Sequence, residues 1–333
     1  MKAIIPVAGA GTKLRPHTYT QPKALIPLAG RTVLSILIDQ LKEHGIRDFI
    51  FIIGYLGEKI QDYVHTHYPE LNCHFVQQSD RLGTGQAVYL TRELVAGEEV
   101  LIMLGDTIAD YSLKEVLDAD TSMLGIKKVD DPRNFGVAEI EADGMISRVV
   151  EKPAIPKSNM ALVGIYRIRE SVQLFECLEK ILSTQPELTD LSITDALDCM
   201  IGMGIPFRSF KVSNWFDCGK KETLIESNAI LLKKFGGNVQ ENNPYQNTVI
   251  IPPVSIGEGC VIKNSVIGPN VAIGEFTSVN QAIIRDSIIG SYSNIHEIVL
   301  NDSLIGSDAE VKGGSRTLNI GDNTAIDLGG NRT

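Results

Sequence analysis

The sequence lacks the features that mark secreted, membrane-spanning and nucleic-acid-binding proteins. Its five cysteines are scattered and include no CxxC pair, so neither a disulfide framework nor a zinc knuckle is indicated. No apolar run approaches the roughly 18 residues that a membrane span needs. The formal net charge is −10, and no stripe of lysine and arginine is dense enough to follow a phosphate backbone. We therefore expect a cytoplasmic globular protein that binds neither membrane nor nucleic acid.

What the sequence does contain is a glycine loop close to its start. Residues Ala3–Val7 form an apolar run that is too short for a helix and leads into Gly9, Ala10 and Gly11, which predicts a buried strand and then a loop. Glycine backbone can approach phosphate oxygens closely, and its N–H groups converge on them as fixed dipoles. The loop lacks the Gly-Lys-Ser/Thr end of a Walker A motif and the third glycine of a Rossmann fingerprint. It therefore predicts a different kind of phosphate cradle.

Helix and strand patterns alternate after this loop, which predicts a doubly wound, Rossmann-like α/β sheet. Ligands of such sheets bind beyond the carboxyl ends of the strands. The glycine loop and Gly105-Asp106, which follows the apolar run Val100–Leu104, both fall at that edge. The expected helices are Thr32–His44, Glu58–His67 and Gly85–Leu94, and the expected strands between them are Asp48–Ile53, Asn72–Gln77 and Glu99–Leu104.

The run Gly9–Pro16, followed by Thr18 and Pro22–Leu25, resembles the signature of the sugar-1-phosphate nucleotidyltransferases. One residue departs from that signature, because the family has arginine after Gly-Thr and this chain has Lys13, which keeps the charge but loses the bidentate fork. The resemblance implies that the chain binds dTTP or UTP and glucose 1-phosphate. The nucleotide-binding residues that it implies are Ala8, Gly9, Gly11, Thr12, Lys13, Gln78, Gly83 and Thr84.

The choice of base depends on Gln78 and Gly83, which resemble the glutamine and glycine that pair with the nucleobase in the family. A glutamine side chain offers both a donor and an acceptor, which suits the imide edge of thymine or uracil. The neighbouring Gln77 is a rival for this role, and the family has alanine more often where Gly85 stands. The sequence therefore favours a pyrimidine nucleotide without choosing between thymine and uracil.

Sugar recognition is expected at a hairpin whose strands are residues 134–141 and 145–150. By resemblance, Gly136 faces the sugar, Glu151 accepts hydrogen bonds from sugar hydroxyls, and Lys152 meets the sugar phosphate. The following segment, with Asn159 and Val163, resembles the stretch that lies along the sugar, in wording closer to the glucose-1-phosphate thymidylyltransferases than to the mannose enzymes.

Two carboxylates are candidates for a Mg²⁺ site. Asp106 follows the buried strand, and Asp217 stands in Trp215-Phe216-Asp217-Cys218-Gly219, which resembles the family's second metal motif. A few hard oxygen ligands suit a Mg²⁺ ion shared with substrate phosphates. The alternative role for each aspartate is to cap a helix or turn, and for Asp217 both roles could coexist.

The chain changes character after Gly236-Gly237, and we expect domains at residues 1–236 and 237–333. From Ile256 an aliphatic residue followed by glycine recurs, with last intervals of 16, 16 and 15 residues, which predicts a parallel β-helix of hexapeptide repeats. The resemblance implies that this β-helix is left-handed. We expect it to serve as a scaffold or a contact between copies of the chain, rather than as an acetyltransferase. The repeat pairs are Ile256-Gly257, Ile267-Gly268, Ile273-Gly274, Ile289-Gly290, Ile305-Gly306 and Ile320-Gly321.

The resemblance implies in-line attack of glucose 1-phosphate on the α-phosphorus of the nucleotide. Catalysis then depends on positioning and on neutralising charge. The alternatives are the same reaction with UTP and N-acetylglucosamine 1-phosphate or with GTP and mannose 1-phosphate, a non-catalytic sensor of sugar nucleotides, and added acetyl transfer. The expected catalytic residues are Lys13, Lys23, Asp106, Lys152 and Asp217.

Overall fold

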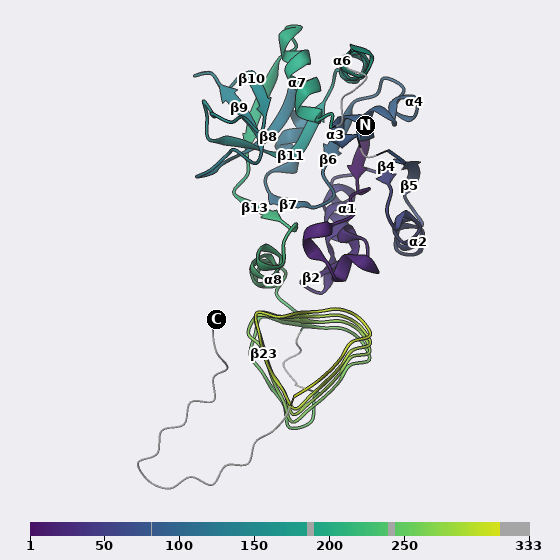
Figure 1. Ribbon diagram of the computed structural model, residues 1–333, viewed down its shortest axis with the longest axis vertical. Coiled ribbons are helices and arrows are strands. Elements are labelled where there is room, and N and C mark those ends of the chain that lie inside the picture. The colour runs from purple at the N-terminus through teal and green to yellow at the C-terminus, as the bar shows by residue number, and fades with distance from the viewer. Residues whose placement is uncertain (81, 185–189, 239–243, 314–333) are drawn as a thin grey trace. The chain divides into compact units, whose positions relative to one another are not determined.

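The chain folds into two compact units, residues 1–237 and the residues from 238 onward (Figure 1). The structure is a computed structural model of the 333-residue chain, and it describes residues 1–80, 82–184, 190–238 and 244–313. Within these residues, no helix is long and apolar enough to cross a membrane.

The first unit is built on a mixed sheet with the strand order β10-β9-β11-β6-β1-β4-β5, to which β8 and β12 are added beside β11. Strand β1 lies in its middle and pairs in parallel with β4 and β6, whereas β11 runs antiparallel to β6. This confirms the predicted α/β class. The strands are β1 (Lys2–Pro6), β4 (Asp48–Ile53), β5 (Asn72–Gln77), β6 (Val100–Met103), β8 (Ser122–Lys128), β9 (Gly136–Ile140), β10 (Ile146–Glu151), β11 (Met160–Ile168) and β12 (Phe207–Lys211).

Helices cover this sheet because apolar side chains recur at helical spacing in the segments between strands. The predicted helix over 85–94 is two shorter ones, α3 and α4, because Leu90 and Thr91 interrupt it. The helices are α1 (Val33–Glu43), α2 (Gly57–His67), α3 (Gly83–Tyr89), α4 (Arg92–Val95), α5 (Leu113–Asp118), α6 (Ser171–Thr184), α7 (Ile193–Gly202) and α8 (Lys221–Phe235). Short 3-10 helices η1 (Thr12–Leu14), η2 (His17–Tyr19) and η3 (Lys23–Leu25), and the ribbons β2 (Pro27–Leu28) with β3 (Arg31–Thr32) and β7 (Thr107–Asp110) with β13 (Asn214–Asp217), complete the unit.

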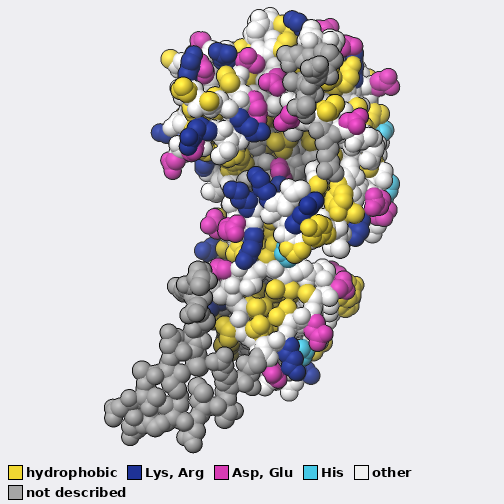
Figure 2. Space-filling view, in the orientation of Figure 1, with side chains coloured by type: hydrophobic (Ala, Val, Ile, Leu, Met, Phe, Trp, Pro, Cys, Tyr) yellow, Lys and Arg dark blue, Asp and Glu magenta, His cyan; other side chains and the backbone are white. Residues whose placement is uncertain are grey.

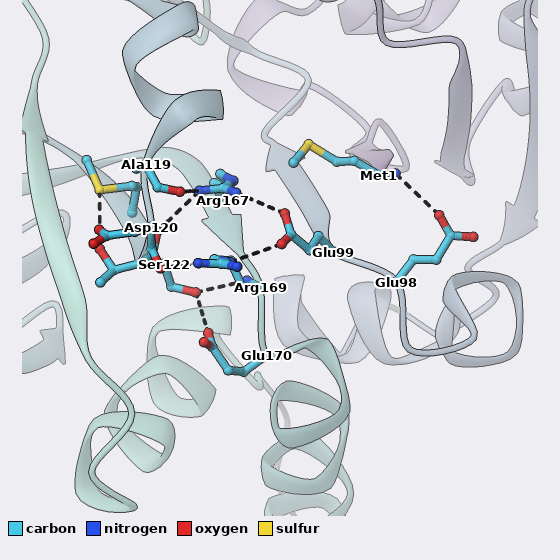
Figure 3. A network of polar contacts seen from close by, with 11 residues as sticks. Met1, Glu98, Glu99, Ala119, Asp120, Ser122, Arg167, Arg169 and Glu170 are labelled. Carbon is cyan, nitrogen blue, oxygen red and sulfur yellow. Dashed lines mark hydrogen bonds and ion pairs between the residues drawn. The ribbon is translucent and has the colours of Figure 1, made fainter.

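A polar network ties the start of β6 to the end of β11 (Figure 3). Arg167 is only 4% exposed and donates to Glu99 Oε2 at 2.9 Å and to the Ala119 carbonyl at 2.6 Å. Arg169 Nε donates to the other carboxylate oxygen of Glu99 at 3.0 Å. Burial alone would raise the pKa of Glu99, but the hydrogen bonds and charges of the two arginines outweigh it and lower that pKa. The network fixes these two strands at the end opposite Gly105-Asp106.

The second unit is a parallel β-helix of three sheets, seen in Figure 1 nearly down its axis as a triangle. Parallel register joins Val254 to Val271 and Ile273 to Ile289, so one coil takes 16 or 17 residues. The predicted pair Ile320-Gly321 lies outside the described residues. The sheets are β14 (Val249–Ile250), β17 (Val266–Ile267), β20 (Ile283–Arg285) and β23 (Val299–Asn301); β15 (Val254–Ile256), β18 (Val271–Ile273), β21 (Ile288–Ile289) and β24 (Leu304–Ile305); and β16 (Val261–Lys263), β19 (Ser278–Asn280), β22 (Asn294–His296) and β25 (Glu310–Lys312).

The aliphatic-glycine pattern has a direct cause in this unit. The aliphatic member points inward, as at Ile273 and Ile289, which are 2% and 1% exposed, and the inner side chains form the core (Figure 2). The glycine lies where neighbouring coils touch: a Cβ at Gly274 would stand 2.5 Å from the backbone nitrogen of Ser291. Only glycine fits without moving that backbone.

Candidate active site

A cavity of about 570 Å³ opens at the carboxyl ends of β1 and β6 in the first unit. It lies where a doubly wound sheet places its ligands. Lysine and arginine side chains gather around the middle of the face of this unit shown in Figure 2. The cavity is lined by Pro6, Val7, Ala8, Gly9, Lys23, Ala24, Gln78, Gly83, Thr84, Ala87, Leu104, Gly105, Asp106, Glu151, Lys152, Asp190 and Ser192.

The glycine loop after β1 forms one wall of this cavity. Gly9 faces open space, because no heavy atom lies within 4 Å of where its Cβ would stand. Gly11 has a left-handed backbone with φ +60°, and Thr18 Oγ1 donates to its carbonyl at 2.8 Å. A side chain at Gly11 would meet the methyl group of Thr18 at 2.8 Å. Gly9 therefore leaves the backbone accessible, and Gly11 shapes the turn.

Asp106 stands at the end of β6, opposite this loop. The preceding Gly105 has no room for a side chain, because its Cβ would lie 2.3 Å from Val7 Cγ1 and 2.8 Å from the Pro6 carbonyl oxygen. That close approach brings the ends of β1 and β6 together. Asp106 Oδ2 accepts a hydrogen bond from Lys23 Nζ at 2.6 Å, with the lysine side chain 17% exposed and the carboxylate 40% exposed. A charged pair thus sits between the two strand ends.

The ribbon of β7 and β13 brings the second predicted metal ligand to the same place. Asp217 pairs with Thr107 across the ribbon, and the backbone nitrogen of Cys218 donates to the carbonyl of Asp106 at 3.1 Å. The side chain of Asp217 lies outside the described part of the structure. In the described residues, no group of three or more His, Cys, Asp or Glu side chains could hold a metal alone. A Mg²⁺ site at Asp106 and Asp217 therefore stays a prediction, for an ion that would also take oxygens from substrate phosphates.

Gln78 is buried at the cavity wall, and its amide nitrogen is already in use. Nε2 donates to the Gly83 carbonyl at 3.2 Å and to Gln86 Oε1 at 2.7 Å, which occupies both of its protons. The amide oxygen is left as the acceptor. Gly83 is the first residue of α3, where a helix leaves its N–H groups without intrahelical partners. The donor expected from Gln78 is thus committed inside the protein.

Glu151 and Lys152 stand at the end of β10, and two contacts fix the glutamate. Thr194 Oγ1 donates to Glu151 Oε2 at 2.8 Å, and Lys152 Nζ lies 3.4 Å from Glu151 Oε1. Lys152 has a left-handed backbone with φ +41°, which is strained for a residue other than glycine, and its N–H donates to the Phe135 carbonyl at 3.0 Å. A Cβ at Gly136 would lie 2.9 Å from Thr194 Oγ1, so glycine is needed for this approach.

Some predicted residues do not line the cavity. Thr12 and Lys13 are exposed on η1, Asn159 is exposed before β11, and Val163 is only 1% exposed within that strand. Their assigned roles stay predictions. The predicted site residues outside the cavity lining, among those whose side chains are described, are Gly11, Thr12, Lys13, Gly136, Asn159 and Val163.

The structure adds a segment that sequence reasoning missed. Asp190 and Ser192 line the cavity, and the Leu191 carbonyl between them accepts from Gly85 N at 2.7 Å. The only sequence signal here is the capping box that Ser192 forms with Asp195 at the start of α7. A capping box indicates where a helix begins, not that the residues before it line a site.

Comparisons with known proteins agree with this geometry. A model of the nucleotidyl transferase family matches residues 2–234. The bifunctional protein GlmU of Methanococcus vannielii is 33% identical over 261 residues, which are 75% of this chain and 61% of that protein. A glucose-1-phosphate thymidylyltransferase of Streptomyces griseus is 32% identical over 241 residues, 70% of this chain and 66% of that protein. The fold matches a UDP-glucose pyrophosphorylase solved with UDP-glucose, with a TM-score of 0.61 at 24% identity, over 70% of this chain and 98% of that one.

Proposed function

Because the chain belongs to the nucleotidyl transferase family, we propose that it transfers a nucleoside monophosphate from dTTP or UTP to glucose 1-phosphate and releases pyrophosphate. The relative from Streptomyces griseus is named for glucose 1-phosphate and a thymidylyl group, which supports this pair. The chain spans only about three fifths of the length of the GlmU relative, so that protein's full set of activities is not transferred to it.

One observation carries the proposal: a single cavity gathers the groups that this reaction needs from segments far apart in the chain. Gly9, Lys23 and Asp106 line the part beside β1 and β6, and Glu151 and Lys152 line the part beside β10. A nucleoside triphosphate and a sugar phosphate are both strongly anionic, so two lysines and an open glycine backbone in one cavity suit them.

In this mechanism the chain acts by placing the two phosphates in line and by neutralising charge. The backbone at Gly9 and the ammonium of Lys23 hold the triphosphate, and Lys152 holds the phosphate of the attacking sugar. Glu151 accepts hydrogen bonds from sugar hydroxyls and so fixes the direction of attack. No side chain forms a covalent bond with the nucleotide, because the attacking oxygen belongs to the sugar phosphate.

Asp106 and Asp217 would hold Mg²⁺ beside the triphosphate. The ion would withdraw charge from the leaving pyrophosphate. Lys23 donates to Asp106 Oδ2 at 2.6 Å, so its ammonium would add positive charge beside the same carboxylate.

The base would be read by one acceptor and one donor. The free amide oxygen of Gln78 accepts from N3–H of thymine or uracil, and the N–H of Gly83 donates to a neighbouring carbonyl oxygen. Cytosine has no N–H at that ring position and would leave the buried Gln78 oxygen unpaired, which costs about 1–3 kcal/mol.

We also propose that copies of the chain associate through the β-helix. The outer face of one sheet carries aliphatic residues in register, Val249, Val266, Ile283 and Val299, three of them between 42% and 62% exposed. A second copy could cover them. Light scattering of the full chain across a concentration series tests this, and a monomer at every concentration would reject it.

Pyrophosphate release with Mg²⁺ tests the reaction. A matrix would combine dTTP, UTP, CTP, ATP and GTP with the 1-phosphates of glucose, N-acetylglucosamine, mannose and galactose. We expect release only with dTTP or UTP and glucose 1-phosphate. Release with UTP and N-acetylglucosamine 1-phosphate, or with GTP and mannose 1-phosphate, would keep the reaction and replace the substrates. Nucleotide binding without release in any pair would support a sensor.

A further inference from the structure

A short segment, residues 190–194 before and at the start of α7, joins the two ends of the cavity. On the nucleotide side, Leu191 N donates to the Leu82 carbonyl at 2.8 Å, and Ile193 N donates to Thr84 Oγ1 at 3.1 Å. On the sugar side, Thr194 Oγ1 donates to Glu151 at 2.8 Å. The segment is thus bonded to α3 and to the end of β10, which come from distant parts of the chain.

The bond from Thr194 is built into the protein rather than formed at its surface. Thr194 is 2% exposed, and its N–H donates to the capping oxygen of Ser192 at 3.2 Å. A second bond holds the same helix to the same strand, because Val149 N donates to Asp198 Oδ1 at 3.1 Å. Two contacts of α7 therefore fix the last residues of β10, where Glu151 stands.

We propose that Thr194 is a positioning residue that holds the Glu151 carboxylate in the orientation needed to receive the sugar. The proposal rests on the function proposed above for this cavity. Thr194 occupies Oε2, so that Oε1, on the side of Lys152, is the oxygen presented to a sugar hydroxyl.

Losing the bond from Thr194 to Glu151 should affect the binding of only one of the two substrates. Without the threonine hydroxyl, the carboxylate can rotate, and the sugar must supply the cost of ordering it on binding. Gly9 and Lys23 line the part of the cavity beside β1 and β6. Thr194 donates its hydrogen bonds to Ser192 and Glu151, so the triphosphate contacts should keep their geometry. Losing Thr194 should therefore weaken sugar phosphate binding and leave nucleotide binding unchanged.

Thr194→Val tests this, because valine keeps the shape and removes the donor. We expect the KM for glucose 1-phosphate to rise about tenfold, the size expected for one lost hydrogen bond to a charged group, with the KM for dTTP within twofold of wild type. Thr194→Ser should restore the wild-type KM. Thr91→Val is the matched control, since Thr91 is also buried and donates to the Val88 carbonyl at 2.7 Å, away from the cavity.

Calorimetric binding of glucose 1-phosphate separates this proposal from the proposed reaction. If wild type shows no turnover but binds glucose 1-phosphate about tenfold more tightly than Thr194→Val, the positioning role stands and the reaction fails. Equal sugar affinity in wild type and Thr194→Val overturns the positioning role, whatever the turnover. Two other results also overturn it: equal losses of affinity for sugar phosphate and nucleotide in Thr194→Val, or a KM for glucose 1-phosphate in Thr194→Ser as high as in Thr194→Val.

Discussion

Asp106→Asn should nearly abolish pyrophosphate release while leaving the fold intact. The substitution removes one negative charge and keeps an oxygen at the position that now accepts from Lys23 Nζ at 2.6 Å. The Lys23 side chain is only 17% exposed, so the substitution leaves a largely buried ammonium facing a neutral amide oxygen. We expect the free energy of unfolding to fall by about 1–2 kcal/mol, because a hydrogen bond between charged groups becomes one to a neutral amide.

The effect on rate should be far larger than the effect on stability. Removing one group that stabilises charge in a transition state costs roughly 10²–10³ in kcat, or about 3–4 kcal/mol. Asp106 would act twice, by holding Mg²⁺ and by orienting Lys23. The loss should therefore appear in kcat at saturating substrates, and added Mg²⁺ should restore part of it if weaker metal binding is the cause.

Asp110→Asn provides a matched control on the same ribbon. Asp110 lies at the far end of β7, where it accepts from Lys234 and Asn214, away from the cavity lining. Pyrophosphate release and thermal unfolding would be measured for both variants at several Mg²⁺ concentrations. Full activity of Asp106→Asn would remove the metal assignment, and equal losses in both variants would mean that the ribbon, rather than the Asp106 carboxylate, matters.

Three further predictions concern packing and charge. Gly105→Ala should destabilise the first unit by about 1–3 kcal/mol in urea unfolding, because the new methyl would stand 2.3 Å from Val7 Cγ1, directly after β1. A variant as stable as wild type would contradict the close approach. The pKa of Glu99 is lowered below 4.5 by Arg169 and Arg167 against the effect of burial. The ionised Glu99 carboxylate therefore stabilises the fold above pH 4.5, and this stabilisation is lost as the pH falls through the lowered pKa. The free energy of unfolding of Glu99→Gln should thus fall less than that of wild type between about pH 5 and about pH 3. Ile284→Ala, at a position that is 0% exposed in the β-helix core, should cost about 2–5 kcal/mol in thermal unfolding with kcat unchanged; loss of kcat would tie the β-helix to catalysis.

The strand ends that form the cavity could be predicted from sequence because their signals are local. An apolar run followed by Gly9, and another followed by Gly105-Asp106, each indicate a buried strand that ends in a polar turn. The rule that ligands bind at the carboxyl ends of parallel strands then brings them together without a structure. The β-helix could be predicted for a similar reason, since each coil repeats one constraint: an inward aliphatic residue beside a glycine that touches the next coil.

The segment before α7 and the ribbon of β7 and β13 could not be predicted, because their roles depend on contacts between distant parts of the chain. Thr194 meets Glu151 across 43 positions, and Ile193 meets Thr84 across 109. Serine, threonine and aspartate are common in loops, so no sequence pattern marks the residues that make these contacts. The hydrogen bonds of the Gln78 amide could not be predicted for the same reason. Its partner Gln86 is eight positions away on α3, and the start of α3 is hydrogen-bonded to the distant Leu191.

Lys13 is the residue that departs from the family signature and so favours a non-catalytic sensor, but its position outside the cavity lining weakens that reading. It is exposed on η1 and does not line the cavity, whereas Lys23 does and is bonded to Asp106. The Lys23–Asp106 pair stands inside the cavity, with the lysine side chain 17% exposed, where it would face a bound phosphate. The cavity keeps cations at both of its ends, at Lys23 and Lys152. The proposal of catalysis depends on the residues inside the cavity, and a role for Lys13 in holding the triphosphate stays a prediction.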